Sequence, residues 1–329
     1  MRPQLLLPVL LATAAFAQDS ADPKQKALAS AKQNAVTLEL DLPYANNENP
    51  KQAVDLYLPK NPTREKPLPV IAFIHGGGWV NGDRIGYSAA CIQMARTGDY
   101  AAVGIGYRLS KEAPWPAQIH DCKAAIRWIR GHAKEYNLDP DRITVWGSSA
   151  GGHLSSLLGT SGDVKELEGS LGSFPTLSSR VHCVVNLCGP QDFTQALMFD
   201  PKNQPIFKDD AVIGLLGGPS PDKPDIAKAA SPITYITPDD PPFITLHGTA
   251  DQRVAYRHAE TLHAALQKAS VPSLLIPITG GGHSSVSHPD VKKRAEPFVA
   301  KYLRGIDSTI DISPIEALPT KPRNGNGKG

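Results

Sequence analysis

Short apolar runs recur along the chain, each bounded by glycine, proline or polar residues. A strand that is covered by helices on both faces shows a nearly continuous apolar run rather than an alternating one. The sequence therefore predicts buried, parallel strands at these positions. The runs are Val70–Ile74, Ala101–Ile105, Ile143–Trp146, Val184–Leu187, Phe243–Leu246 and Leu274–Ile276.

The segments around these runs have helical character. Within Pro116–Tyr136, apolar residues recur three and four positions apart, which gives one apolar helix face. Strands that alternate with helices indicate right-handed crossovers, so we predict an α/β fold with a mostly parallel central sheet and helices on both faces. The expected helices are Ser88–Arg96, Pro116–Tyr136, Ala150–Leu158, Tyr256–Lys268 and Pro289–Arg304.

Two parts of the chain depart from this rhythm. Val36–Leu42 and Ala53–Leu58 alternate apolar and polar residues and predict an antiparallel pair, which follows a short helix at Asp22–Gln33. Residues 191–237 are rich in proline and glycine and hold only a weak helix, at Asp209–Leu216. This stretch follows a strand, on the side where open α/β sheets bind ligands. We interpret it as a small inserted cap; a meandering surface loop is the alternative.

The two ends read differently from the middle. Residues 1–17 carry one arginine, an apolar run too short to span a bilayer and the small-residue arrangement Ala15-Phe16-Ala17. We predict a secretory signal peptide cleaved after Ala17 and a secreted or periplasmic protein, with an uncleaved anchor as the alternative. The catalytic domain would span residues 18–310, and residues 311–329 would form a disordered tail.

Composition restricts the function further. The 329 residues are 41% hydrophobic and 20% charged, with a formal net charge of +2, which gives no electrostatic argument for nucleic acid or for an anionic membrane surface. There is no C-x-x-C and no zinc-like spacing, so we expect neither a metal nor another cofactor. Four cysteines in an exported protein allow three disulfide pairings, but we favour buried free thiols. They are Cys91, Cys122, Cys183 and Cys188.

The pentapeptide Gly147-Ser148-Ser149-Ala150-Gly151 fits the pattern G-x-S-x-G. It lies between an apolar strand and a helix, which is the context that a nucleophile elbow requires. The spacing selects Ser149 as the nucleophile and not the neighbouring Ser148.

A glycine-rich segment, His75-Gly76-Gly77-Gly78-Trp79, follows the first buried strand. Glycines at a strand end let backbone N–H groups point inward, as needed to stabilise an oxyanion during acyl transfer. A phosphate-binding loop is the alternative, but neither of the glycine patterns of such loops, G-x-x-x-x-G-K-[ST] and G-x-G-x-x-G, is present.

A serine nucleophile needs a base, and the base needs an orienting carboxylate. His283 lies in a glycine-rich loop after the last buried strand, and Asp251 follows the strand before it. The chain order Ser149, Asp251, His283 is the order that this type of site uses.

Other histidines are weaker candidates for the base. His288 precedes a proline and should begin the last helix, and His247 at a strand end is expected to be structural. His258 and His263 lie on a helix, where we expect them to be solvated.

These motifs, in this order, resemble those of the α/β-hydrolases. The chain is most similar to the esterase and lipase group with an HGGGW loop, including bacterial esterases related to feruloyl and acetyl-xylan esterases. The similarity covers residues 70–300, most of the chain. The matching segments are His75–Trp79, Asn81–Arg84, Tyr107–Leu109, Pro116–Ile119, Asp121–Lys123, Gly147–His153, His247–Asp251 and Gly281–His283.

The resemblance implies a role for each matched residue. Ser149 would be the nucleophile, His283 the general base and Asp251 its orienter. Trp79 would line the substrate pocket, although packing beneath the loop is nearly as good an interpretation. Arg108 and Asp121 would lock the scaffold. The implied oxyanion hole consists of the backbone N–H groups of Gly77, Gly78 and Ala150.

The implied function is that of an exported serine esterase. It would act through an acyl-enzyme on small-molecule or polysaccharide-linked esters, with acetyl or feruloyl groups of plant polysaccharide as candidates. One alternative is a serine peptidase of the prolyl-oligopeptidase type, but such enzymes usually carry a large extra domain for which this length leaves no room. The other is a non-catalytic binding module on the same fold.

Overall fold

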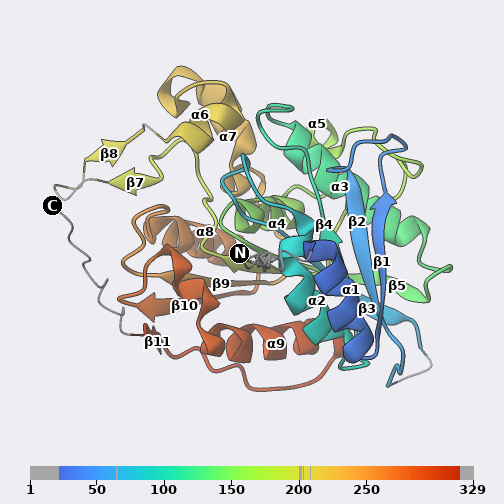
Figure 1. Ribbon diagram of the computed structural model, residues 1–329. Coiled ribbons are helices and arrows are strands. Elements are labelled where there is room, and N and C mark those ends of the chain that lie inside the picture. Colours follow the sequence, from blue (N-terminus) through green and yellow to red (C-terminus); the bar gives the residue numbers. More distant parts are fainter. Residues whose placement is uncertain (1–21, 64–65, 200–201, 203, 208, 319–329) are drawn as a thin grey trace, which may run out of the picture.

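The computed structural model describes residues 22–63, 66–199, 202, 204–207 and 209–318 (Figure 1). The predicted signal peptide, residues 1–17, lies outside the described residues, as does the end of the predicted tail, residues 319–329. Within the described part, no helix is long and apolar enough to cross a membrane.

A nine-stranded sheet forms the centre of the described part of the chain, in the order β1-β2-β4-β3-β5-β6-β9-β10-β11. The first two strands pair antiparallel with each other, and β2 pairs antiparallel with β4, whereas the following pairs are parallel. The strands are β1 (Val36–Pro43), β2 (Ala53–Pro59), β3 (Leu68–Ile74), β4 (Ala101–Ile105), β5 (Leu138–Ser148), β6 (Cys183–Leu187), β9 (Phe243–Gly248), β10 (Ser273–Thr279) and β11 (Ile315–Glu316).

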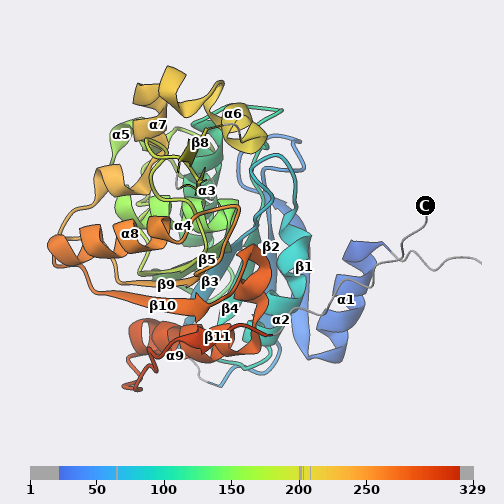
Figure 2. The same cartoon turned by 90° about the vertical axis from the view of Figure 1, so that its left-hand side faces the viewer.

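Helices cover both faces of this sheet, which confirms the predicted α/β architecture (Figures 1 and 2). Alternate residues of β3 enter different cores: Val70 and Ala72 pack on one face, and Ile71 and Phe73 on the other. The first core includes α3 (Ala117–Gly131), α4 (Ala150–Thr160) and α8 (Arg257–Lys268). The second includes α1 (Pro23–Gln33), α2 (Ser88–Ala95) and α9 (Pro289–Arg304).

The predicted strands are all present, but the burial of one differs from the expectation. In β10, Leu274 and Leu275 are only half-buried, whereas all residues of β6 and β9 are buried. The reason is position: β10 has only the two-residue strand β11 between it and the sheet edge.

The prediction of a disordered tail at residues 311–329 is wrong for Ile315 and Glu316. Ile315 and Glu316 pair in parallel with the end of β10, and the Ile315 side chain is buried in the second core. One apolar side chain and a strand edge with free backbone groups suffice to order this segment, although the surrounding composition is polar.

The segment 191–237 contains more structure than the sequence predicts. The expected weak helix is present as α6 (Asp210–Leu216), capped by the Asp209 carboxylate, which accepts the N–H groups of Ala211 and Val212. A second helix in the same segment, α7 (Pro224–Ala230), was not predicted. Together they lie at the top of both views (Figures 1 and 2). The other elements of the segment 191–237 are β7 (Met198–Phe199), β8 (Pro205–Ile206), η2 (Ser220–Asp222) and η3 (Pro232–Tyr235).

The four cysteines are buried free thiols, as we favoured from the sequence. Burial raises the pKa of each of them above the ordinary value, to about 12 for Cys183. The thiols therefore stay protonated and pack as small apolar groups.

Candidate active site

The turn from β5 into α4 places Ser149 at its tip. Ser149 has a φ of 55° and a ψ of −121°, a conformation that residues other than glycine rarely adopt. Its N–H donates to the carbonyl oxygen of Leu187 on the neighbouring strand, over 2.8 Å. This strained turn places the serine between the strand and the helix, as the G-x-S-x-G pattern predicts.

The two glycines of the pentapeptide are required by close packing. A Cβ on Gly147 would lie 2.2 Å from the carbonyl oxygen of Gly151, and a Cβ on Gly151 would lie 2.0 Å from the carbonyl oxygen of Ile74. Both obstacles are backbone atoms, which cannot rotate away. The helix can therefore begin this close to β3 only if both positions lack a side chain.

We expect Gly151→Ala to destabilise the fold by about 3 kcal/mol, because one methyl group overpacks a backbone contact. The free energy of unfolding in urea measures the effect. Gly86→Ala is the control, since a Cβ at Gly86 meets nothing within 4 Å, and its change should stay within about 0.5 kcal/mol. Equal stability of the two variants would contradict the packing argument.

The structure brings Ser149, His283 and Asp251 together from three strand ends. His283 Nε2 lies 2.9 Å from Ser149 Oγ, and His283 Nδ1 lies 2.7 Å from Asp251 Oδ2. The carboxylate fixes the proton of the imidazole on Nδ1, which leaves Nε2 free to accept the proton of the serine hydroxyl. This is the geometry of a nucleophile, a base and an orienting acid.

Asp251 is held by more groups than the sequence indicated. Its Oδ1 accepts the backbone N–H groups of Arg253 at 2.8 Å and Val254 at 3.1 Å. Its Oδ2 lies 3.2 Å from Nε2 of His247, which also contacts the carbonyl oxygen of Val254 at 2.9 Å. Burial raises the pKa of the Asp251 carboxyl, but the hydrogen bonds from His247, His283 and the Arg253 backbone outweigh it, and the pKa is held well below its ordinary range. The acid therefore stays ionised.

The glycine-rich loop after β3 supplies two of the three backbone N–H groups predicted for the oxyanion hole, and Ala150 at the start of α4 supplies the third. Gly77 has a φ of 111° and Gly78 a φ of 61°, so both need the conformational freedom of glycine. Among the described residues, no acceptor takes the N–H groups of Gly77, Gly78 or Ala150. Unused backbone donors beside a serine hydroxyl can stabilise a developing negative charge.

Trp79 is almost fully buried. Its side chain is only 2% exposed, and its indole N–H donates to Nδ1 of His153 over 3.2 Å. His153 Nε2 in turn lies 2.7 Å from the carbonyl oxygen of Ala230 in α7. Burial lowers the pKa of His153 to about 4, so the imidazole is neutral and bridges the loop to the segment 191–237. Trp79 therefore packs against this bridge, and because it also borders the cavity described next, its contact with a substrate stays a prediction.

A cavity of about 600 Å³ opens above these groups. The glycine loop, Ser149 and His283 line it, together with residues of the segment 191–237. Those residues are Leu197, Asp209 and Ala211. The segment therefore forms one wall of the cavity, which supports the interpretation as a cap.

Two expectations about other residues have clear outcomes. His258 is 1% exposed, not solvated: its Nδ1 accepts the N–H of Gln191, and its Nε2 lies 3.1 Å from the carbonyl oxygen of Ala196. Helical periodicity misled here, because the irregular segment that covers His258 has no pattern of its own. Arg108 and Asp121 do lock the scaffold through a salt bridge of 2.8 Å, with the carboxylate fully buried.

One group of described residues has the side-chain types of a metal site. The ligand atoms of Cys188, Asp251 and His283 all lie within 4.8 Å of one another. However, the Asp251 and His283 atoms are 2.7 Å apart, whereas two ligands of one tetrahedral zinc ion stand about 3.3 Å apart. That spacing is the spacing of a hydrogen bond.

Comparisons with known proteins agree with this geometry. The BD-FAE family model matches residues 54–266. Esterase LipQ of Mycobacterium tuberculosis is 30% identical over 235 residues, which are 71% of this chain and 54% of that protein. The probable carboxylic ester hydrolase LipM of the same organism is 34% identical over 261 residues, or 76% of this chain and 58% of that protein. The chain thus spans little more than half the length of these relatives.

Solved structures match over a larger share of the chain. A truncated form of a carbohydrate esterase from gut microbiota has a TM-score of 0.75 and 30% identity, covering 81% of this chain and 96% of that one. A bifunctional GH43-CE protein of Bacteroides eggerthii has a TM-score of 0.73 and 32% identity, covering 82% of this chain and 35% of that one.

Proposed function

Because the chain belongs to the BD-FAE family of α/β-hydrolase esterases, we propose that it is a serine carboxylic ester hydrolase. The single observation that carries the proposal is the unbroken line of contacts from Ser149 Oγ through His283 to Asp251. A non-catalytic module would have no need to hold a serine in a strained turn against a correctly oriented imidazole.

The proposed reaction has two steps. Ser149 Oγ attacks the ester carbonyl carbon while Nε2 of His283 takes its proton, and the N–H groups of the oxyanion hole donate to the carbonyl oxygen as it becomes negative. His283 then gives the proton to the departing alcohol oxygen, leaving the acyl group on Ser149. Water, activated by the same imidazole, attacks this acyl-enzyme and releases the acid.

The proposed substrates are small acyl esters, with acetyl or feruloyl groups on plant polysaccharide as candidates. Two supports are the carbohydrate esterase among the similar structures and the cavity of about 600 Å³, which is large enough for a sugar-linked alcohol. Residues 191–237 would act as the cap that selects this alcohol, within one catalytic domain of residues 18–310. We also propose that residues 1–17 direct export of the protein, which would bring it into contact with such a polysaccharide.

A test combines labelling with a substrate panel. The full chain should hydrolyse p-nitrophenyl acetate and release acid from acetylated xylan or methyl ferulate, and a serine-directed fluorophosphonate should modify Ser149. Peptide mass spectrometry locates the label, and dipeptide amides serve as the comparison substrates. Hydrolysis of the amides alone, or a label on another residue, would contradict the proposal.

A further inference from the structure

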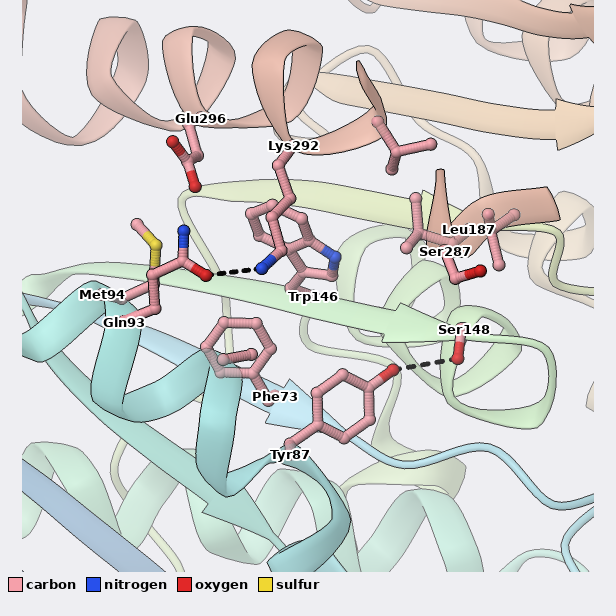
Figure 3. Close-up of a pocket in the computed structure, with 13 residues that line it drawn as sticks. Phe73, Tyr87, Gln93, Met94, Trp146, Ser148, Leu187, Ser287, Lys292 and Glu296 are labelled. Carbon is pink, nitrogen blue, oxygen red and sulfur yellow. Dashed lines mark hydrogen bonds between the residues drawn. The ribbon is translucent and has the colours of Figure 1, made fainter. Parts of the chain in front are cut away.

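A second cavity, of about 240 Å³, lies directly beside the candidate active site. Figure 3 shows it between the side chains of α2, the strands β3 and β5, and α9. Its walls come from both the helices and the strands of the second core. The residues that carry the argument below are Phe73, Tyr87, Ala90, Met94, Trp146 and Val286.

The lining of this cavity is almost wholly apolar. Phe73 stacks on Tyr87 with 5.4 Å between ring centroids and contacts Trp146 at 5.6 Å, so flat aromatic surfaces form much of the wall. Two pairs of polar groups at its edge bond to each other: the Tyr87 hydroxyl lies 2.9 Å from Ser148 Oγ, and Lys292 Nζ donates to Gln93 over 2.5 Å (Figure 3). The Glu296 carboxylate on α9 also borders the cavity. A group placed here would meet ring faces and methyl groups rather than free donors.

The two cavities share part of their lining. Ser148, Val286 and Ser287 border both of them. Ser148 immediately precedes the candidate nucleophile, and Val286 follows the candidate base by three residues. A group attached to Ser149 therefore has a second compartment within reach, on a different side from the cap.

We propose that this second cavity is the acyl subsite and takes a ring-sized apolar acyl group. The inference rests on the proposed esterase function and adds to it which part of the ester lies where. An apolar cavity of about 150 Å³ is enough to bind benzene, so 240 Å³ holds a single ring with a short linker. Asn81, Asp209 and Arg253 line the larger cavity under the cap, which offers a sugar more hydrogen-bond partners, so the alcohol is assigned to that cavity.

Helix α2 offers a residue that sets the depth of this subsite. Ala90 lines the cavity, and Met94 lies one turn later on the same helix face. A larger side chain at Ala90 would fill the space that the ring occupies. The adjacent Ala89 is exposed and does not line the cavity, which makes it a matched control on the same helix.

The experiment compares two p-nitrophenyl esters, the acetate and the 3-phenylpropanoate, on the full chain. We expect wild-type kcat/KM to be at least about tenfold higher for the phenylpropanoate, because its ring gains a pocket that acetate leaves empty. Ala90→Phe should lower that ratio by about tenfold or more through loss of phenylpropanoate turnover. Ala89→Phe should keep the wild-type ratio.

A second variant guards against a folding defect in the first. Met94→Ala enlarges the cavity and should raise kcat/KM for the longer 4-phenylbutanoate ester relative to the acetate. Wild-type hydrolysis of acetate without hydrolysis of the phenylpropanoate would overturn the subsite while leaving the esterase proposal intact, as would an Ala90→Phe ratio equal to that of Ala89→Phe. Failure of the wild-type chain on every ester would instead overturn the proposed function itself.

Discussion

Ser149→Ala should lower kcat/KM for p-nitrophenyl acetate on the order of 10⁴-fold or more. Oγ is the only non-hydrogen atom removed, and it is the atom that lies 2.9 Å from His283 Nε2. Stability should change little, because alanine meets the same positive φ of 55° that serine already tolerates. Steady-state kinetics and a thermal unfolding curve on the same preparation measure both effects.

The neighbouring serine provides the matched control. Ser148 is one residue away on the same turn, but its hydroxyl faces Tyr87 rather than His283. Ser148→Ala should stay within about tenfold of wild-type activity, since it removes a hydrogen bond and not the attacking atom. If Ser148→Ala were the inactive variant, or if Ser149→Ala kept its turnover, the assignment of the nucleophile would be wrong.

The positions of the buried strands could be read from the sequence because these strands are continuous apolar runs. Five apolar residues at Val70–Ile74 admit few interpretations, and the structure buries all of them. The nucleophile elbow could also be predicted from the sequence. A Cβ at position 147 or 151 would lie within 2.2 Å of a backbone oxygen, so both positions must be glycine, and the pattern is visible in the sequence. Local constraints of this kind are visible without a structure.

The features that could not be predicted from the sequence depend on contacts between segments that are distant along the chain. His258 looks like a solvated helical residue until the irregular chain near Gln191 and Ala196 covers it. Ile315 looks like part of a polar tail until the edge of β10 pairs with it. In both cases one of the two contacting segments has no periodicity, so no pattern in the sequence predicts the contact.

The apolar cavity beside the elbow was hidden for a related reason. Its walls are residues such as Phe73 and Trp146, which the sequence already assigns to buried strands. An apolar residue in a strand looks the same whether it fills the core or lines a cavity. Only the placement of α2 against α9 distinguishes the two, and that placement is tertiary.

Asp251→Asn should lower kcat on the order of 10³–10⁴-fold, with KM little affected. The cause is the tautomer of His283. Two backbone N–H groups, from Arg253 and Val254, donate to Oδ1, so the amide oxygen of asparagine must take that position. The amide NH₂ then faces His283 and donates to Nδ1, which moves the imidazole proton to Nε2 and removes the acceptor for the Ser149 hydroxyl.

His247→Leu is the control that separates orientation from general damage around the carboxylate. It removes the second N–H donor to Oδ2 of Asp251 but leaves the contact between Asp251 and His283. We therefore expect a loss of only about tenfold, and the pairing of Ser149→Ala with Asp251→Asn should cost little more than Ser149→Ala alone. An Asp251→Asn enzyme with a tenth of wild-type kcat, or additive losses in the double variant, would show that Asp251 does not act through His283. The carboxylate would then serve the fold, holding the turn after β9, and the base would have to be oriented by something else.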